Sequence, residues 1–191
     1  IKPDLRPSPK VFFPSLDWQM PAARRSSMLS PTRFCFLNKA HDIPAIACSQ
    51  SAELQKLWLY NLHYFDCLNA KGAETREKWH RNFISQWIAE NPPCFGVGWE
   101  PYPLSLRITN WIKWALAGNA LDETARHSLA VQVRFLARRL ERHLLGNHLF
   151  SNAKALVFAG CYFDGDEATG WLRLGMQTLE NEVLEQILED G

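Results

Sequence analysis

From Ser51 to the end of the chain, apolar residues recur every three to four positions, which is the period of an α-helix with one buried face. The pattern breaks at short segments rich in Asn, Pro, Asp or Gly, such as residues 91–93 and residues 164–165. Six apolar stripes result, and they run over residues 54–68, 79–88, 104–115, 129–144, 149–161 and 171–187. We expect six helices, with Asp122 as the N-cap of the fourth and Gly146 as its C-terminal stop.

The connections between these helices are short, which makes consecutive helices antiparallel neighbours. Several stripes are wide, as in helices that are contacted on more than one side. No strand-like alternation follows Ser51, which disfavours an α/β fold, and no repeat of fixed length is visible. The pattern therefore predicts an all-α body over residues 51–191, made of stacked helical hairpins as in an α/α toroid or a solenoid rather than an isolated four-helix bundle.

Residues 1–50 have a different character, because seven prolines leave no room for a long helix. Apolar anchors, among them Phe12 and Trp18, recur between the prolines. We expect an extended, Pro-rich N-terminal arm that packs on the helical body, with a short strand within residues 34–37. The first residue is Ile1 rather than Met, and residues 189–191 directly follow a helical pattern, so we expect a piece of a larger protein.

The charge balance narrows the class of partner. The chain has 21 Lys and Arg against 20 Asp and Glu, which argues against a nucleic-acid or membrane-surface protein. One local exception is a group of four arginines on one predicted helix, Arg134, Arg138, Arg139 and Arg142, which is either a solvated face or part of a basic cleft. No apolar run reaches the roughly 18 residues of a membrane span. Five widely spaced cysteines predict neither a zinc ribbon nor a disulfide framework, and we expect no metal and no cofactor.

Three short segments carry polar groups that helix packing does not require. They are residues 58–66, the Gly- and Pro-rich loop and helix start at 96–107, and residues 145–155. Their candidate binding and catalytic residues are His63, Tyr64, Trp99, Glu100, Tyr102, Arg107, Asn147, His148 and Asn152. A rigid loop that displays Trp99, Glu100 and Tyr102 suits stacking on sugar rings and recognition of hydroxyls. Arg107 can hold a carboxylate through its planar fork.

Each segment also has a purely structural explanation. The first fits a buried helix whose polar groups find hydrogen bonds, and the second fits a structural loop with Arg107 in an internal ion pair. In the third, Asn147 can cap a helix and His148 can be a core histidine. No HExxH pair, GxSxG turn or phosphate-binding loop accompanies them.

Taken together, these segments resemble the N-terminal helical domain of the heparinase II/III-like polysaccharide lyases. The strings are Tyr-Asn-Leu-His-Tyr-Phe-Asp (60–66), Gly-Trp-Glu-Pro-Tyr-Pro-Leu-Ser-Leu-Arg (98–107) and Gly-Asn-His-Leu (146–149), the last followed by Asn-Ala-Lys-Ala-Leu (152–156). The resemblance covers about residues 30–191, in order. It implies an incomplete α/α toroid, followed in the whole protein by a β-sandwich domain that is missing from this chain.

The resemblance also implies an activity, which is β-elimination in a uronic-acid-containing polysaccharide. In that scheme Asn147 neutralises the uronate carboxylate, and His148 acts as the base or supports the carboxylate. The other seven candidates, His63, Tyr64, Trp99, Glu100, Tyr102, Arg107 and Asn152, would bind substrate. The Tyr acid of the family lies beyond Gly191, so we expect this chain alone to be inactive.

Two other functions stay open. One is a non-catalytic glycan-binding or polysaccharide-biosynthesis-associated module, and the other is a helical scaffold that binds a partner protein through its aromatic surface. The expected partners are an acidic polysaccharide and the missing β-sandwich domain, with no nucleic acid. Heparin-like, alginate-like and capsule-type uronates all remain candidates. The resemblance favours a periplasmic or secreted location, although no signal peptide is visible.

Overall fold

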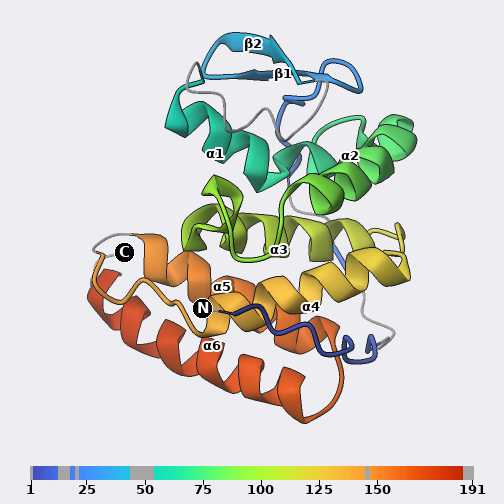
Figure 1. Ribbon diagram of the computed structural model, residues 1–191. Helices are drawn as coiled ribbons and strands as arrows, with labels where there is room; N and C mark the ends of the chain where they lie inside the picture. The colour runs from blue at the N-terminus through green and yellow to red at the C-terminus, as the bar shows by residue number, and fades with distance from the viewer. Residues whose placement is uncertain (1, 13–17, 20–21, 44–53, 145–146, 187–191) are drawn as a thin grey trace.

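The computed structural model describes residues 2–12, 18–19, 22–43, 54–144 and 147–186 (Figure 1). The elements are β1 (Arg33–Phe36), β2 (Lys39–Asp42), α1 (Lys56–Tyr64), η2 (Asp66–Asn69), η3 (Ala73–Arg76), α2 (Glu77–Glu90), η4 (Val97–Trp99), α3 (Pro101–Leu116), α4 (Glu123–Ala137), α5 (Asn147–Tyr162) and α6 (Asp166–Gln186). The described part of the chain is therefore mainly helical, with six α-helices and one small sheet. The prediction of a mainly helical chain is confirmed, while the closed geometry of a toroid stays a prediction.

Helix α3 lies at the centre of the molecule. It contacts α1 on one side and α4 and α5 on the other, and α6 packs on the outside of α5 (Figure 1). Ile108, Trp111 and Ile112 of α3 are completely buried, which explains why this apolar stripe is wide. The α5–α6 packing is tight, because a Cβ on Gly160 would lie 2.6 Å from the backbone nitrogen of Leu172.

The strands β1 and β2 form an antiparallel hairpin that covers α1 (Figure 1). Leu37 and Asn38 connect them and both have positive φ, as a two-residue turn between twisted strands requires. Phe34 is buried beneath the hairpin, and the Trp58 indole Nε1 donates to the Lys39 carbonyl at 2.9 Å. The strand predicted within residues 34–37 is therefore present.

Several predicted helix boundaries agree with the structure. Helix α4 begins after Asp122, whose carboxylate accepts from the Ala125 backbone N–H at 2.8 Å. Helices α2 and α5 end at the predicted breaks, and Gly165 has a φ of 94°. Helix α1 is shorter than its stripe, because Phe65 adopts a left-handed conformation and a 3-10 turn follows.

The predicted length of the fourth helix is wrong. Helix α4 ends at Ala137, and the next amides make 3-10-type bonds, such as Arg139 N–H to the Leu136 carbonyl at 2.8 Å. The Glu141 N–H then donates to the side chain of Asn152 at 2.9 Å instead of continuing the helix. A tertiary hydrogen bond thus replaces the helical one, and the proposed stop at Gly146 lies outside the described residues.

The N-terminal residues 2–12 run along α4 and reach the α5–α6 turn (Figure 1). The Arg134 guanidinium donates to the carbonyls of Arg6 and Pro7, at 2.6 and 2.8 Å, and forms an ion pair with Glu167 at 2.7 Å. The side chain of Arg134 is only 3% exposed. It therefore belongs neither to a solvated face nor to a basic cleft, because its donors are used to hold the chain terminus.

Candidate functional site

A cleft of about 590 Å³ lies between α1, α3 and α5. Its walls carry aromatic, amide, hydroxyl and cationic side chains, and the lining residues are Ala22, Arg24, Asn61, Tyr64, Asp66, Asn69, Tyr102, Leu106, Thr109, Asn110, Lys113, Asn147, Phe150, Ser151 and Lys154. Three of the residues predicted from the sequence, Tyr64, Tyr102 and Asn147, are among them. The cleft is large enough for several sugar-sized groups and is open to solvent.

One end of the cleft is formed by the first residues of α5. The Asn147 amide Nδ2 donates to the Tyr102 hydroxyl at 3.2 Å, and the Tyr102 ring lies 4.4 Å from the His148 ring, centroid to centroid. Asn147 lines the cleft, whereas His148 is not one of the lining residues and packs against Tyr102 with a third of its side chain exposed. The amides in the first turn of a helix carry partial positive charge, which favours an anion at this end.

His148 contacts the carboxylate of Glu141, a residue that no sequence motif had indicated. Glu141 Oε2 lies 3.2 Å from His148 Nδ1 and also accepts from the Asn152 amide at 3.3 Å. An ionised carboxylate can only accept, so in the neutral ring this contact places the imidazole proton on Nδ1 and leaves Nε2 with its lone pair. Glu141 lies four residues beyond the end of α4, within the stretch for which the apolar pattern predicts a continuous helix, so no local motif marks it.

Asn152 has a supporting position and does not line the cleft. It is completely buried, it accepts from the Glu141 backbone, and its amide also donates to the Ser105 hydroxyl at 2.9 Å. All the hydrogen-bonding capacity that the structure shows for Asn152 is directed into the protein. The expectation that Asn152 binds substrate is therefore corrected, because its contacts hold Glu141 in place and a ligand has no access to it.

The floor of the cleft is a network of amides. Asn110 Nδ2 donates to the Tyr64 carbonyl and to Asp66 Oδ1, each at 2.8 Å, and Asn69 donates to the Asn110 side chain at 3.2 Å. Burial, and then the neighbouring Tyr102, raise the pKa of Tyr64, so its phenol stays protonated. These contacts fix Tyr64 and Asp66 at the wall, and they include two residues, Asn69 and Asn110, that no sequence motif had indicated.

The opposite end of the cleft is cationic. Lys113 of α3, Lys154 of α5 and Arg24 line it, and Asp66 is the only acidic residue in the lining of the described cleft. Burial, followed by the charge of Lys154, lowers the pKa of Lys113. Burial, followed by the charge of Arg24, lowers the pKa of Lys154. The cleft therefore combines a polar, aromatic end with a positively charged end.

The structure places Trp99 in the interior, not on a sugar-binding surface. Trp99 is 3% exposed, and its ring packs against Trp87 and Phe135, with centroids 5.9 and 5.5 Å away. At least one face of an aromatic ring must be accessible for a sugar to stack on it. The expectation that Trp99 binds sugar is therefore corrected, because the apolar ring gains more from core packing than from display on a loop.

His63 and Arg107 are also interior residues. His63 is 1% exposed, its Nδ1 accepts from Trp87 Nε1 at 2.9 Å, and burial lowers its pKa to about 3, so the ring is neutral. Arg107 is completely buried, with its guanidinium 3.8 Å from the centre of the Trp87 ring and its Nε bonded to Gln132 at 2.9 Å. Neither residue reaches a ligand in the cleft. A Cβ at Gly98 would lie 2.8 Å from the His63 ring, which accounts for this glycine.

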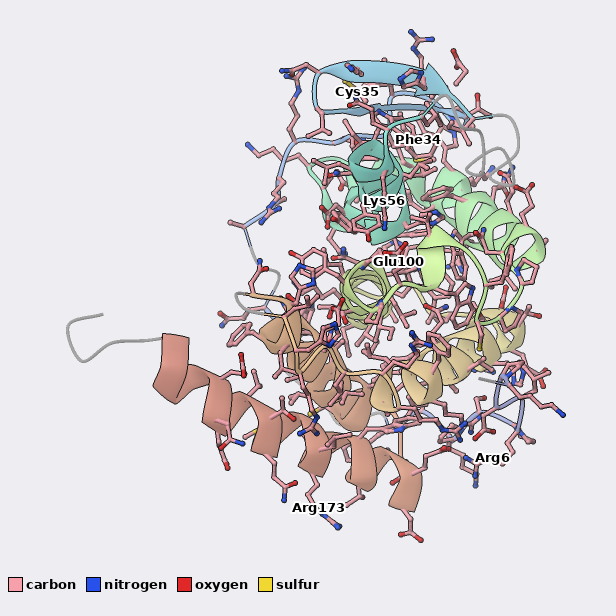
Figure 2. The ribbon with its side chains drawn as sticks, turned by 60° about the vertical axis from the view of Figure 1, so that its left-hand side comes forward. Arg6, Phe34, Cys35, Lys56, Glu100 and Arg173 are labelled. Atoms are coloured by element: carbon pink, nitrogen blue, oxygen red, sulfur yellow. The ribbon has the colours of Figure 1, made fainter. Side chains whose placement is uncertain are left out.

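Glu100 lies outside the cleft. Its carboxylate pairs with Lys56 at 3.0 Å and accepts from the Tyr60 hydroxyl, and Figure 2 shows Lys56 and Glu100 at adjoining ends of α1 and α3. Glu100 thus ties the start of α3 to α1. Within the described residues, no group of three or more His, Cys, Asp or Glu side chains is placed to hold a metal.

Comparison with family models matches residues 30–191 to the heparinase II/III N-terminus. The chain belongs to this family. No match was found among curated proteins or among solved structures. Membership makes this heparinase II/III N-terminal domain a module related to the polysaccharide lyases. No helix in the described ranges is both long enough and apolar enough to cross a bilayer.

Proposed function

We propose that the domain is the N-terminal part of a polysaccharide lyase that cleaves uronic-acid-containing polysaccharide by β-elimination. The observation that carries this proposal is the group at the start of α5, where Asn147 lines the cleft and His148 is held by Glu141. An amide donor, an imidazole with a fixed proton and a helix N-terminus lie together there. That combination suits the abstraction of a proton next to a carboxylate.

The reaction needs stabilisation of negative charge. A base removes the C5 proton of the uronate, the electron pair forms the C4–C5 double bond, and the C4–O4 bond breaks with its electrons on oxygen. Charge accumulates on the carboxylate during this step, and donors aimed at it lower the barrier. Asn147 Nδ2 is the donor in this proposal, and the partial positive charge of the α5 N-terminus adds to it.

His148 is the proposed base or carboxylate support. Its Nδ1 proton is directed at Glu141, so the lone pair of Nε2 is available to accept a proton. Asn152, whose amide also donates to the Ser105 hydroxyl, restrains Glu141 from the buried side, and this holds the acceptor of the imidazole in place. Tyr102 orients Asn147 through its hydroxyl, and its ring packs at a tilt against the His148 ring. The acid that protonates O4 is, in this proposal, a Tyr that follows Gly191.

The test is product formation by the full-length protein. Asn147→Ala and His148→Ala are expected to abolish the ultraviolet absorbance of the unsaturated uronate, with heparan sulfate, alginate and capsule-type uronates as trial substrates. His143→Ala is the matched control, because His143 is an exposed histidine in the same segment. Circular dichroism checks that all three variants fold. Full activity in both Asn147→Ala and His148→Ala contradicts the proposal.

A second candidate is a glycan-binding module without lyase activity. The position of His148 favours it, because His148 does not line the cleft. In this case oligosaccharide binding survives His148→Ala, and the full-length protein forms no unsaturated product from any of the three polymers. Binding then depends on cleft residues such as Tyr64 and Tyr102.

A further inference from the structure

We propose that Lys113, Lys154 and Arg24 form a second anion-binding site in the cleft, which takes an acidic group of a sugar some 10 Å from the one bound at Asn147. This inference rests on the proposed function only in taking the ligand to be a polysaccharide. The cationic site itself is argued from the geometry of the cleft.

The cleft follows one face of two helices. On α5 the lining residues Asn147, Ser151 and Lys154 are spaced four and three apart, so they lie one above another on the same face. Lys154 follows Asn147 by seven helical positions, which is about 10 Å along the axis at the usual rise of 1.5 Å per residue. A chain bound along this face therefore meets the amide at one end and the ammonium at the other.

Helix α3 runs in the same direction beside α5. Its Tyr102 contacts Asn147, and its Lys113 lies close enough to Lys154 for the two charges to repel each other. At one end of the cleft Tyr102 of α3 thus faces Asn147 of α5. At the other end Lys113 of α3 lies near Lys154 of α5. Arg24 joins them from the N-terminal segment, where its backbone carbonyl accepts from the Lys71 N–H at 2.9 Å.

The protein balances the charge of this cluster only in part: Asp66 attracts both lysines, and the Lys113 ammonium lies 5.8 Å from the centre of the Phe158 ring. None of the ion pairs within the described residues includes Lys113, Lys154 or Arg24. Asp66, the one acidic lining residue, already accepts from Asn110. Both lysines are half-buried, and burial disfavours their charged forms. A bound anion would relieve the repulsion and restore the lost solvation.

The chemistry of the site defines its ligand. Lysine ammonium groups act as point charges without the planar fork of arginine, so they bind either a carboxylate or a sulfate. The expected ligand is a polysaccharide that carries two acidic groups about 10 Å apart, which is the length of two turns of α5. A polymer with a single isolated acid fills only the Asn147 end.

The experiment measures binding by calorimetry in the full-length protein that carries His148→Ala, which prevents turnover in the proposed scheme. Three oligosaccharides of equal length are compared: a polyglucuronate, a heparan sulfate oligosaccharide, and a polyglucuronate with its carboxyl groups reduced to alcohols. Lys113→Gln and Lys154→Gln together are expected to weaken at least one charged ligand by about 10- to 100-fold, the range of a charged hydrogen bond. The neutral ligand is expected to lose no affinity.

The control is Lys78→Gln, an exposed lysine of α2 outside the cleft, which removes the same charge and leaves affinity unchanged. Loss for both charged ligands identifies a carboxylate site, and loss for heparan sulfate alone identifies a sulfate site. Equal affinity in the double variant, an equal loss for the neutral ligand, or no binding of either charged ligand to the His148→Ala protein overturns the proposal. Product formation by the unsubstituted protein is measured separately, so the lyase proposal can fail while the anion site stands.

Discussion

Two clusters of cationic side chains lie on different sides of the helical body. Around Arg134 of α4, two guanidinium groups meet carboxylates: Arg134 pairs with Glu167, and Arg138 pairs with Asp4. Around Lys113 and Lys154, in the cleft, no such partner is present among the described residues. The protein alone accounts for the first cluster, because its guanidinium groups form ion pairs with carboxylates and hydrogen bonds to the N-terminal segment. In the second, the cations share a single acidic neighbour in the cleft lining, Asp66, which forms an ion pair with none of them among the described residues.

The difference also appears in the directions of the pKa shifts. Hydrogen bonding from Arg134 lowers the pKa of Glu167, which is the sign of a stabilised charge. Burial lowers the pKa of Lys113 and of Lys154, which is the sign of a destabilised charge. A protein keeps an unfavourable charge chiefly where function needs it. A positive charge thus has a structural role at Arg134, whereas at Lys113 and Lys154 it favours the binding of an anion.

The largest expected effect comes from the paired cluster. Arg134→Ala removes a buried guanidinium that holds two carbonyls and Glu167, and we expect it to lower the free energy of unfolding by about 3 kcal/mol or more. Arg138→Ala, whose side chain is half exposed, is the control and is expected to cost less than about 1 kcal/mol. Chemical denaturation measures both. Equal effects would show that the Arg134 contacts do not hold the terminus.

The next effect concerns the polar end of the cleft. Glu141→Ala removes the acceptor at His148 Nδ1, so the neutral ring is free to carry its proton on Nε2 instead. NMR shifts of the ring nitrogens, in the chain with labelled histidine, report this change of tautomer. For the proposed lyase activity of the full-length protein we expect kcat to fall on the order of 100-fold, with KM little changed.

Glu141→Gln is the matched variant, because its amide oxygen still accepts from Nδ1. It is expected to keep the tautomer and to recover most of the activity. An unchanged tautomer in Glu141→Ala means that Glu141 does not position the imidazole. A loss of activity that occurs together with a loss of helical signal assigns Glu141 a purely structural role.

The smallest effect is the most direct contrast with Arg134. Lys113→Gln removes a charge that burial makes unfavourable, so in the absence of ligand we expect stability to stay the same or to rise by less than about 1 kcal/mol. The measurement is the midpoint of thermal unfolding at neutral pH. A clear destabilisation would indicate that the contact of the Lys113 ammonium with the Phe158 ring, 5.8 Å from its centre, stabilises the fold. The contrast between the two clusters would then fail.

The sequence predicted the helices because their determinants are local. Apolar period, the Asp122 cap and the break at residues 164–165 act within a few positions, and each is present as expected. The same reasoning failed where a distant residue decided the outcome. The amide of Glu141 bonds to Asn152 and ends the helical run that Leu140 and Leu144 would have continued. No local pattern contains that information.

The candidate site shows the same division. The sequence by itself determined the family, the helical stripes and three cleft residues, Tyr64, Tyr102 and Asn147, because their motifs are contiguous. Only the tertiary structure decided that Trp99 is core and that Glu141 faces His148. It also decided that cations from three separate segments share one end of the cleft. Burial and charge pairing are sums over neighbours in space, and those neighbours are far apart along the chain.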